Sequence, residues 1–177
     1  KDLWLGYPEK INAPYGLAKK MMLVQSQAYR QQYNFNCIHL LMINLYGPRD
    51  NFNPLKSHVV PALIKKINDA HIAKLNKVEL WGTGLSTREF LYVEDAARAI
   101  ILAVEKYDKL EPINLGSGQE VSIKELAYRI SRIIGYKGQI RWDNRKSNSR
   151  PRRRLDITKA QKEFDFMART SLNIGLK

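Results

Sequence analysis

The segment "FLYVEDAARAIILAVEKYDKLEPINLGSG" runs from Phe90 to Gly118 and predicts a strand, a helix and a second strand in succession. It begins extended, and the pattern indicates a helix from about Glu94. Glu94 and Asp95 would then lie in the first turn, where acidic side chains interact favourably with the helix dipole. "PINLGSG" is typical of a strand that ends in glycines. A strand, a helix and a strand in this order favour a parallel sheet.

The same alternation extends over the rest of the chain. Helical spacing and end signals predict helices at 15–33, 58–70 and 122–135, a short helix from 158 and the start of another at 170–177. Strand-like runs lie at 36–45, 77–82 and 139–143. Asn34 is the expected stop of the first helix, Ser57 the expected cap of the second, and a capping box begins the third at Ser122. The prediction is an α/β fold with a largely parallel sheet and a loop at 144–156.

Composition limits the classes of protein to which the chain can belong. With 177 residues, of which 44% are hydrophobic and 27% charged, it suits one globular unit or a large part of a bigger domain. No apolar run approaches the roughly 18 residues that a membrane span requires. No signal peptide is visible at the first residue, Lys1, so a cytoplasmic location is expected. The absence of an initiator Met suggests a clipped N-terminus.

The charge of the chain predicts an anionic partner. Lys and Arg number 30 against 17 Asp and Glu, a net charge of +13, and nucleic acid and a small phosphorylated ligand both remain candidates. Cys37 is the single cysteine and cannot form an internal disulfide. The three histidines show no metal-ligand spacing with one another or with Cys37, so no metal site is expected.

Tyr15 and Lys19 form a Tyr-x-x-x-Lys pattern within "APYGLAKKM" (13–21). On a helix these two residues share a face. An ammonium beside a phenol stabilises the phenolate, so that the phenol can pass a proton to or from a carbonyl or alcohol oxygen. Many helices carry this spacing by chance, and the surrounding sequence has to decide between the two interpretations.

That surrounding sequence carries a family resemblance. "PYGLAKK", "NLYGPRDNF", "SHVVPALI", "WGTGLSTREFLYVEDAARAI" and "NLGSG", in this order, resemble the extended short-chain dehydrogenase/reductase superfamily over nearly the whole chain. Within it the chain is most similar to the GDP-L-fucose synthases, and "NLYGPRDNFNPLKSHVVPAL" (44–63) is the most specific piece. The resemblance implies an NADP-dependent epimerase/reductase acting on GDP-4-keto-6-deoxy-mannose, with NAD as a possible cofactor.

The resemblance also implies a division of the chain. Residues 1–50 would be the last helix and strand of a Rossmann-like nucleotide-binding domain. Residues 51–177 would mainly form a small α/β substrate-binding region, interleaved with returning elements of the nucleotide domain. The family's phosphate-binding glycines, catalytic serine and base cysteine precede the Tyr-x-x-x-Lys segment, and no glycine-rich phosphate loop occurs in this sequence. The chain is therefore expected to be the C-terminal portion of an enzyme, truncated at both ends and inactive alone.

The resemblance assigns roles to individual residues. Tyr15 would donate the proton to the C4 oxygen, Lys19 would assist it and hold the ribose of the nicotinamide, and His58 would be the acid of epimerisation. The expected cofactor contacts are Tyr15, Lys19, Met42, Ile43, Asn44, Leu45 and His58. The expected substrate contacts are Lys66, Trp81, Arg88 and Lys146, with the cations for the phosphates and the indole for packing.

Several of these residues have a simpler interpretation. Trp81 could belong to the core, and Arg88 could pair with Glu89 or Glu94. Lys65 and Lys66 could lie on an ordinary solvent-exposed face of a helix, and only one of them would point at a ligand.

The expected partners follow from the same resemblance. They are a GDP-sugar and a second copy of the chain, with no nucleic acid and no membrane. A homodimer is expected because the Tyr-x-x-x-Lys helix commonly forms part of a dimer interface in this superfamily, and Met21, Met22 and Val24 offer apolar surface. One alternative is another NAD-dependent sugar-nucleotide epimerase or dehydratase, which would not need His58. The other is a nucleic-acid-binding module based on "RKSNSRPRRR" (145–154), although no aromatic interleaving or known nucleic-acid motif accompanies it.

Overall fold

The computed structural model describes residues 2–8, 10–145 and 151–177. Their strands form three small sheets, in which β4 and β6 are the only described antiparallel pair. The first sheet pairs β1 (Leu40–Met42) with β5 (Ile113–Leu115), and the second pairs β3 (Lys77–Trp81) with β7 (Gln139–Asp143). The third contains β2 (Asn44–Tyr46), β4 (Thr87–Tyr92), β6 (Glu120–Ser122) and β8 (Arg152–Arg153). The α/β prediction with parallel strands is confirmed.

The run 36–45, predicted as one strand, is two short strands in different sheets. β1 pairs with β5, whereas β2 pairs with β4, and Ile43 lies between them. The side chain of Ile43 is only 6% exposed, and its N–H donates to the carbonyl of Leu115 at 3.0 Å. The chain therefore changes strand partner at Ile43, and the prediction of one continuous strand was wrong.

All six predicted helices are present. They are α1 (Ala13–Tyr33), α2 (Val59–Ile72), α3 (Val93–Lys106), α4 (Ile123–Ile134), α5 (Thr158–Phe164) and α6 (Leu172–Gly175), with two short 3-10 helices at Asp2–Trp4 and Lys10–Asn12.

The structure tests the predicted helix ends. α1 stops at Asn34, which adopts the left-handed conformation, and α4 ends at Gly135 with φ of 79°. The hydroxyl of Ser122 accepts the N–H of Glu125 at 3.0 Å, as a cap should. The prediction for Ser57 was wrong, because His58 is the residue before α2 and makes no side-chain cap.

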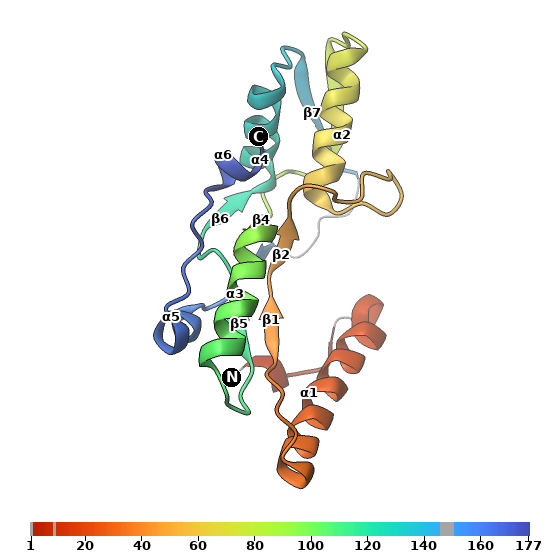
Figure 1. The fold of residues 1–177 in the computed structure, drawn as a ribbon. Coiled ribbons are helices and arrows are strands. Elements are labelled where there is room, and N and C mark those ends of the chain that lie inside the picture. Colours follow the sequence, from red (N-terminus) through yellow and green to blue (C-terminus); the bar gives the residue numbers. More distant parts are fainter. Residues whose placement is uncertain (1, 9, 146–150) are drawn as a thin grey trace.

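Two hydrophobic cores hold these elements together. One lies where α2 and α4 pack against β3, and the other lies where α3 and α5 pack against β1 and β5. Figure 1 shows α2, α4 and β7 at one end of the molecule and α1 at the other. In α1 only Ala13 and Leu23 are buried, so one long helix presents most of its surface to solvent. Within the described ranges, no helix is long and apolar enough to cross a membrane.

Candidate active site

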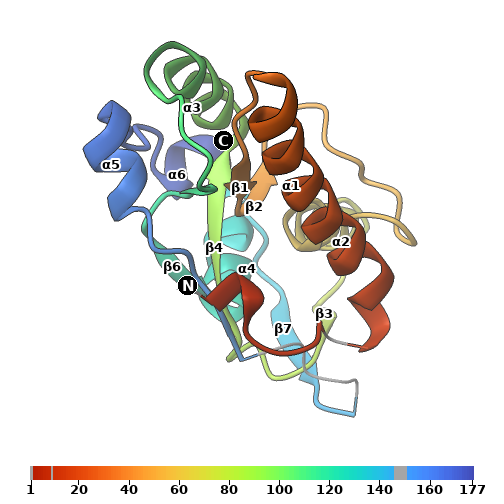
Figure 2. The ribbon, with the colours of Figure 1, turned by 90° about the horizontal axis from the view of Figure 1, so that it is seen from below.

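A cleft of about 850 Å³ brings together residues from distant parts of the chain. Tyr15 and Lys19 enter it from α1, His58 from the residue before α2, and Arg153 from β8. The segment at 3–8 forms another wall, and Figure 2 shows this N-terminal segment passing from the N-terminus towards α1. The cleft thus contains all three residues predicted to be catalytic, although they come from two elements 43 residues apart in the sequence (58 − 15).

Tyr15 and Lys19 have the geometry that their spacing predicted. The Nζ atom of Lys19 lies 5.6 Å from the centroid of the Tyr15 ring, within the range of a cation–π contact. The side chain of Tyr15 is 69% exposed, so its hydroxyl is accessible to a ligand in the cleft. An accessible phenol beside an ammonium is an arrangement that can transfer a proton to a bound oxygen.

His39 lines the same cleft and was not identified from the sequence. Burial, and secondly the charge of Lys19, lower the pKa of His39 below its usual value. The imidazole is therefore predominantly neutral at neutral pH, with one nitrogen available as an acceptor and the other as a donor. Sequence reasoning missed it because a histidine in an apolar run carries no spacing signal.

Arg153 was also missed, because residues 144–156 were expected to form a loop. Instead, Arg152 and Arg153 form β8, which pairs in parallel with Thr87 and Arg88 of β4. Register partners on neighbouring strands project their side chains to the same face of a sheet, so Arg88 and Arg153 form a cationic pair. Burial, and then the charge of Arg153, lower the pKa of Arg88. Two adjacent guanidinium groups are suited to a doubly charged anion such as a diphosphate.

Lys66 and Trp81 form a second pair, outside the residues that line the cleft. The Nζ atom of Lys66 lies 5.1 Å from the centroid of the Trp81 ring, and Trp81 is 67% exposed. Trp81 is therefore not a core residue. Lys65 instead pairs with Asp69 at 3.0 Å, so only one of the two adjacent lysines is directed to the indole. Lys146, the remaining predicted substrate contact, lies outside the described residues.

The four residues predicted to line the nicotinamide occupy different environments. Met42 is half-buried, Ile43 belongs to the core, and Leu45 is exposed. Asn44 is tied to β4, because its Nδ2 donates to the carbonyl of Glu89 at 2.9 Å. None of the four is among the described residues that line the 850 Å³ cleft, where Leu41 is the nearest neighbour in sequence.

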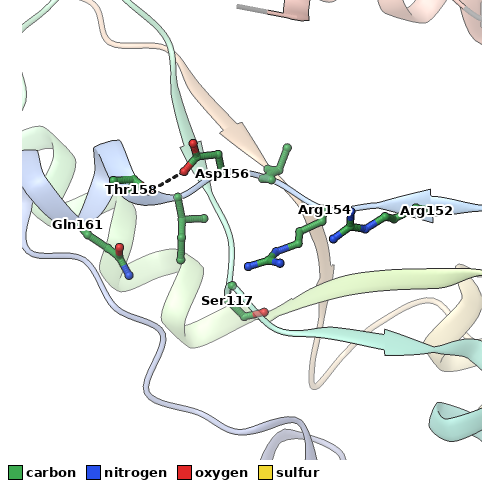
Figure 3. Close-up of a pocket in the computed structure, with 9 residues that line it drawn as sticks. Ser117, Arg152, Arg154, Asp156, Thr158 and Gln161 are labelled. Atoms are coloured by element: carbon green, nitrogen blue, oxygen red, sulfur yellow. Dashed lines mark hydrogen bonds between the residues drawn. The ribbon is translucent and has the colours of Figure 1, made fainter.

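A second concavity, of about 730 Å³, lies beside the segment that follows β8 (Figure 3). Its walls include Ser117, Arg154 and Gln161, and none of the predicted site residues lines it. Arg152 is bound to Glu120 there, with its Nε 2.9 Å from a carboxylate oxygen. Among the described residues, no group of three or more His, Cys, Asp or Glu side chains could hold a metal ion.

Known proteins with similar sequences and structures identify the family. The chain is 42% identical to "Probable GDP-L-fucose synthase 1" of Oryza sativa subsp. japonica, across 99% of this chain and 53% of the rice protein. It is also 42% identical to "GDP-L-fucose synthase" of Sinorhizobium fredii, across 98% of this chain and 55% of that protein. The chain thus spans about half the length of these curated relatives.

A solved structure agrees with the sequence relatives. The GDP-L-fucose synthetase of Naegleria fowleri, bound to NADP, matches with a TM-score of 0.88 and 27% identity, over 97% of this chain and 56% of that one. This likeness shows that the fold is the Rossmann-like one of the epimerase and reductase enzymes. The sequence pattern of the family described as "NAD dependent epimerase/dehydratase family" matches residues 4–116, well over half of the chain. The protein therefore belongs to the NAD dependent epimerase/dehydratase family.

Proposed function

We propose that this chain is the part of an NADP-dependent epimerase/reductase that carries the catalytic tyrosine and binds the substrate, in an enzyme converting GDP-4-keto-6-deoxy-D-mannose to GDP-L-fucose. The observation that carries the proposal is the cleft that Tyr15, Lys19 and His58 share with Arg153. Two curated relatives at 42% identity, named "Probable GDP-L-fucose synthase 1" and "GDP-L-fucose synthase", support the choice of substrate.

The residues of the cleft divide the chemistry between them. Tyr15 donates a proton to the C4 oxygen of the sugar, and Lys19 stabilises the phenolate that remains. NADPH, when bound, supplies the hydride for C4. His58 acts as the acid that returns protons to the carbons beside the ketone during epimerisation.

The cleft fits the nicotinamide ribose end of NADP. Lys19 reaches into it with an ammonium that can donate to ribose hydroxyls, and the space of about 850 Å³ is that of a typical ligand pocket. Met42, Ile43, Asn44 and Leu45 stay proposed nicotinamide contacts, although none of them lines the cleft. A phosphate-binding glycine loop, absent from this sequence, would come from the rest of the enzyme.

The nucleotide part of the substrate is bound by the arginine pair and by the indole of Trp81. Arg88 and Arg153 bind the diphosphate of the GDP-sugar, and Lys66 with Trp81 provides a charge and a flat apolar face for the nucleotide. Lys146 remains a proposed substrate contact.

The proposal includes the organisation of the enzyme. Residues 1–50 belong to the nucleotide-binding domain and 51–177 mainly to the substrate region. The enzyme forms a homodimer through α1, supported by the exposed side chains of Met21, Met22 and Val24. A cytoplasmic location and the absence of a nucleic-acid partner stay predictions.

The test is NMR of the sugar protons when the complete enzyme acts on the GDP-4-keto sugar in D₂O. Deuterium should enter C3 and C5, and reduction at C4 should require NADPH. A product reduced at C4 with hydrogen retained at C3 and C5 would contradict the epimerase part of the proposal. It would favour a simple reductase of the same family instead.

A further inference from the structure

Glu89 is a fully buried carboxylate (0% exposed) on β4, next in sequence to Arg88. One carboxylate oxygen accepts the N–H of Gly118 at 2.7 Å, and the other accepts the N–H of Leu155 at 2.9 Å. A charged group without water needs such partners, and here both are backbone groups from segments distant in sequence. Glu89 therefore joins three parts of the chain at one point.

Both joined segments line the second concavity. Figure 3 shows the segment that carries Ser117 beside the segment that runs from Arg152 to Asp156. The packing around the carboxylate is close, because a Cβ added at Gly116 would overlap an oxygen of Glu89. Only a glycine allows the chain after β5 to approach the carboxylate in this way.

Hydrogen bonds to β4 lie on both sides of the short strand β8. It contains only two residues, fewer than a strand normally needs. The N–H of Thr87 donates to the carbonyl of Pro151 at 2.8 Å before the strand, and Leu155 donates to Glu89 after it. Leu155 is two residues beyond Arg153, so the bond to Glu89 fixes the C-terminal side of the strand that places Arg153.

We propose that Glu89 is a positioning residue for the diphosphate site. It holds β8 in register against β4, so that Arg153, which lines the substrate cleft, lies beside Arg88. Successive residues of a strand face opposite sides of the sheet, so Glu89 acts through the backbone and does not touch the substrate. This inference rests on the proposed function, because it requires Arg88 and Arg153 to bind the GDP-sugar.

The experiment compares two buried carboxylates in the complete enzyme. Glu89→Gln keeps the size of the side chain but turns an NH₂ group towards a backbone N–H, which breaks one of the two bonds. Asp95→Asn is the matched control, because Asp95 is also buried and accepts the N–H groups of Arg169 and Thr170 at 3.1 and 2.8 Å. The measurements are the Kd for GDP by calorimetry, KM and kcat for the sugar nucleotide, and the thermal midpoint.

Glu89→Gln should raise the Kd for GDP and the KM for the sugar nucleotide by roughly tenfold, as expected when the geometry of a charged hydrogen bond is lost. The kcat at saturating substrate should stay within about twofold, since Tyr15 and Lys19 are untouched. Asp95→Asn should lower the thermal midpoint to a similar extent and leave the Kd for GDP unchanged. If both variants raise the Kd for GDP equally, Glu89 contributes only to the stability of the fold, and the inference is wrong.

Arg88→Ala and Arg153→Ala separate this inference from the proposed function. If they weaken GDP binding and Glu89→Gln does not, the inference is wrong and the diphosphate site stands. If neither arginine variant weakens GDP binding, the assignment of the diphosphate site to Arg88 and Arg153 is wrong. The inference about Glu89 is then wrong as well. If Glu89→Gln does not fold, Glu89→Asp takes its place. Its shorter carboxylate should raise the Kd several-fold, and an unchanged Kd overturns the inference.

Discussion

Arg88 and Arg153 lie side by side as register partners of β4 and β8, although 65 residues of sequence separate them (153 − 88). Burial, followed by the charge of Arg153, lowers the pKa of Arg88. Like charges that face each other on neighbouring strands destabilise a sheet. A bound anion would relieve that repulsion, as the diphosphate of the proposed GDP-sugar would do.

Arg153→Ala should therefore weaken binding of GDP to the complete enzyme by roughly tenfold or more, as loss of a charge-assisted contact to a phosphate implies. The salt dependence of the Kd should become shallower, because one cation no longer contacts the ligand. Calorimetric titration at several salt concentrations measures both. Arg152→Ala is the control: Arg152 is bound to Glu120, and its loss should leave the affinity for GDP nearly unchanged.

His58→Asn and Tyr15→Phe should separate epimerisation from reduction. Without the acid, exchange of the C3 and C5 hydrogens with solvent deuterium should slow, while the 4-keto sugar is still reduced at a lower rate. Without the phenol, exchange should persist while reduction falls by about 10²- to 10⁴-fold, the contribution of a positioned proton donor. NMR of the ring protons in D₂O, with NADPH present or withheld, distinguishes the two. If the C3 and C5 hydrogens exchange at the wild-type rate in His58→Asn, the histidine takes no part in epimerisation.

Trp81→Ala should raise the KM for the GDP-sugar several-fold, as loss of an exposed cation–π contact and its flat apolar face implies. Binding of NADPH should not change, because Trp81 does not line the cleft that holds Tyr15. Lys66→Ala should act in the same direction. Lys65→Ala is the matched control on the same helix, since Lys65 pairs with Asp69 and should affect the KM little.

The lowered pKa of His39 predicts a pH dependence of stability. Protonation of His39 is less favourable in the fold than in the unfolded chain, where its pKa is 6.5. As the pH falls below 6.5 the unfolded chain takes up the proton first, so the free energy of unfolding decreases until the lower pKa of the folded state has been passed.

Thermal unfolding measured between about pH 5 and 7, where histidine titrates, should show this loss, and His39→Gln should reduce it. His71→Gln, at an exposed site at the end of α2, is the control. Lys19→Met should raise the pKa of His39 in an NMR titration, but only part of the way, because burial is the larger cause. A pKa of His39 at or above its ordinary value would contradict the arrangement of the cleft.

Local features of the sequence determined the helices and the pairing of Tyr15 with Lys19. Ser122 and Gly135 mark the ends of α4 by hydrogen bonding and backbone conformation within a few residues, and both predictions are confirmed. Tyr15 and Lys19 come together for the same reason, since four residues make about one turn of a helix whatever surrounds it.

Only the tertiary structure showed that Arg153 and His39 join that pair. Arg153 reaches the cleft because β8 pairs with β4, and a two-residue strand has no periodicity that a sequence could reveal. Ile43 divides one apolar run into β1 and β2 because their partners are β5 and β4, which lie much later in the chain. His39 lines the cleft for a similar reason, as its position depends on β1 and α1 meeting in space. Local chemistry sets turns and caps, whereas strand partners depend on contacts between residues far apart in sequence.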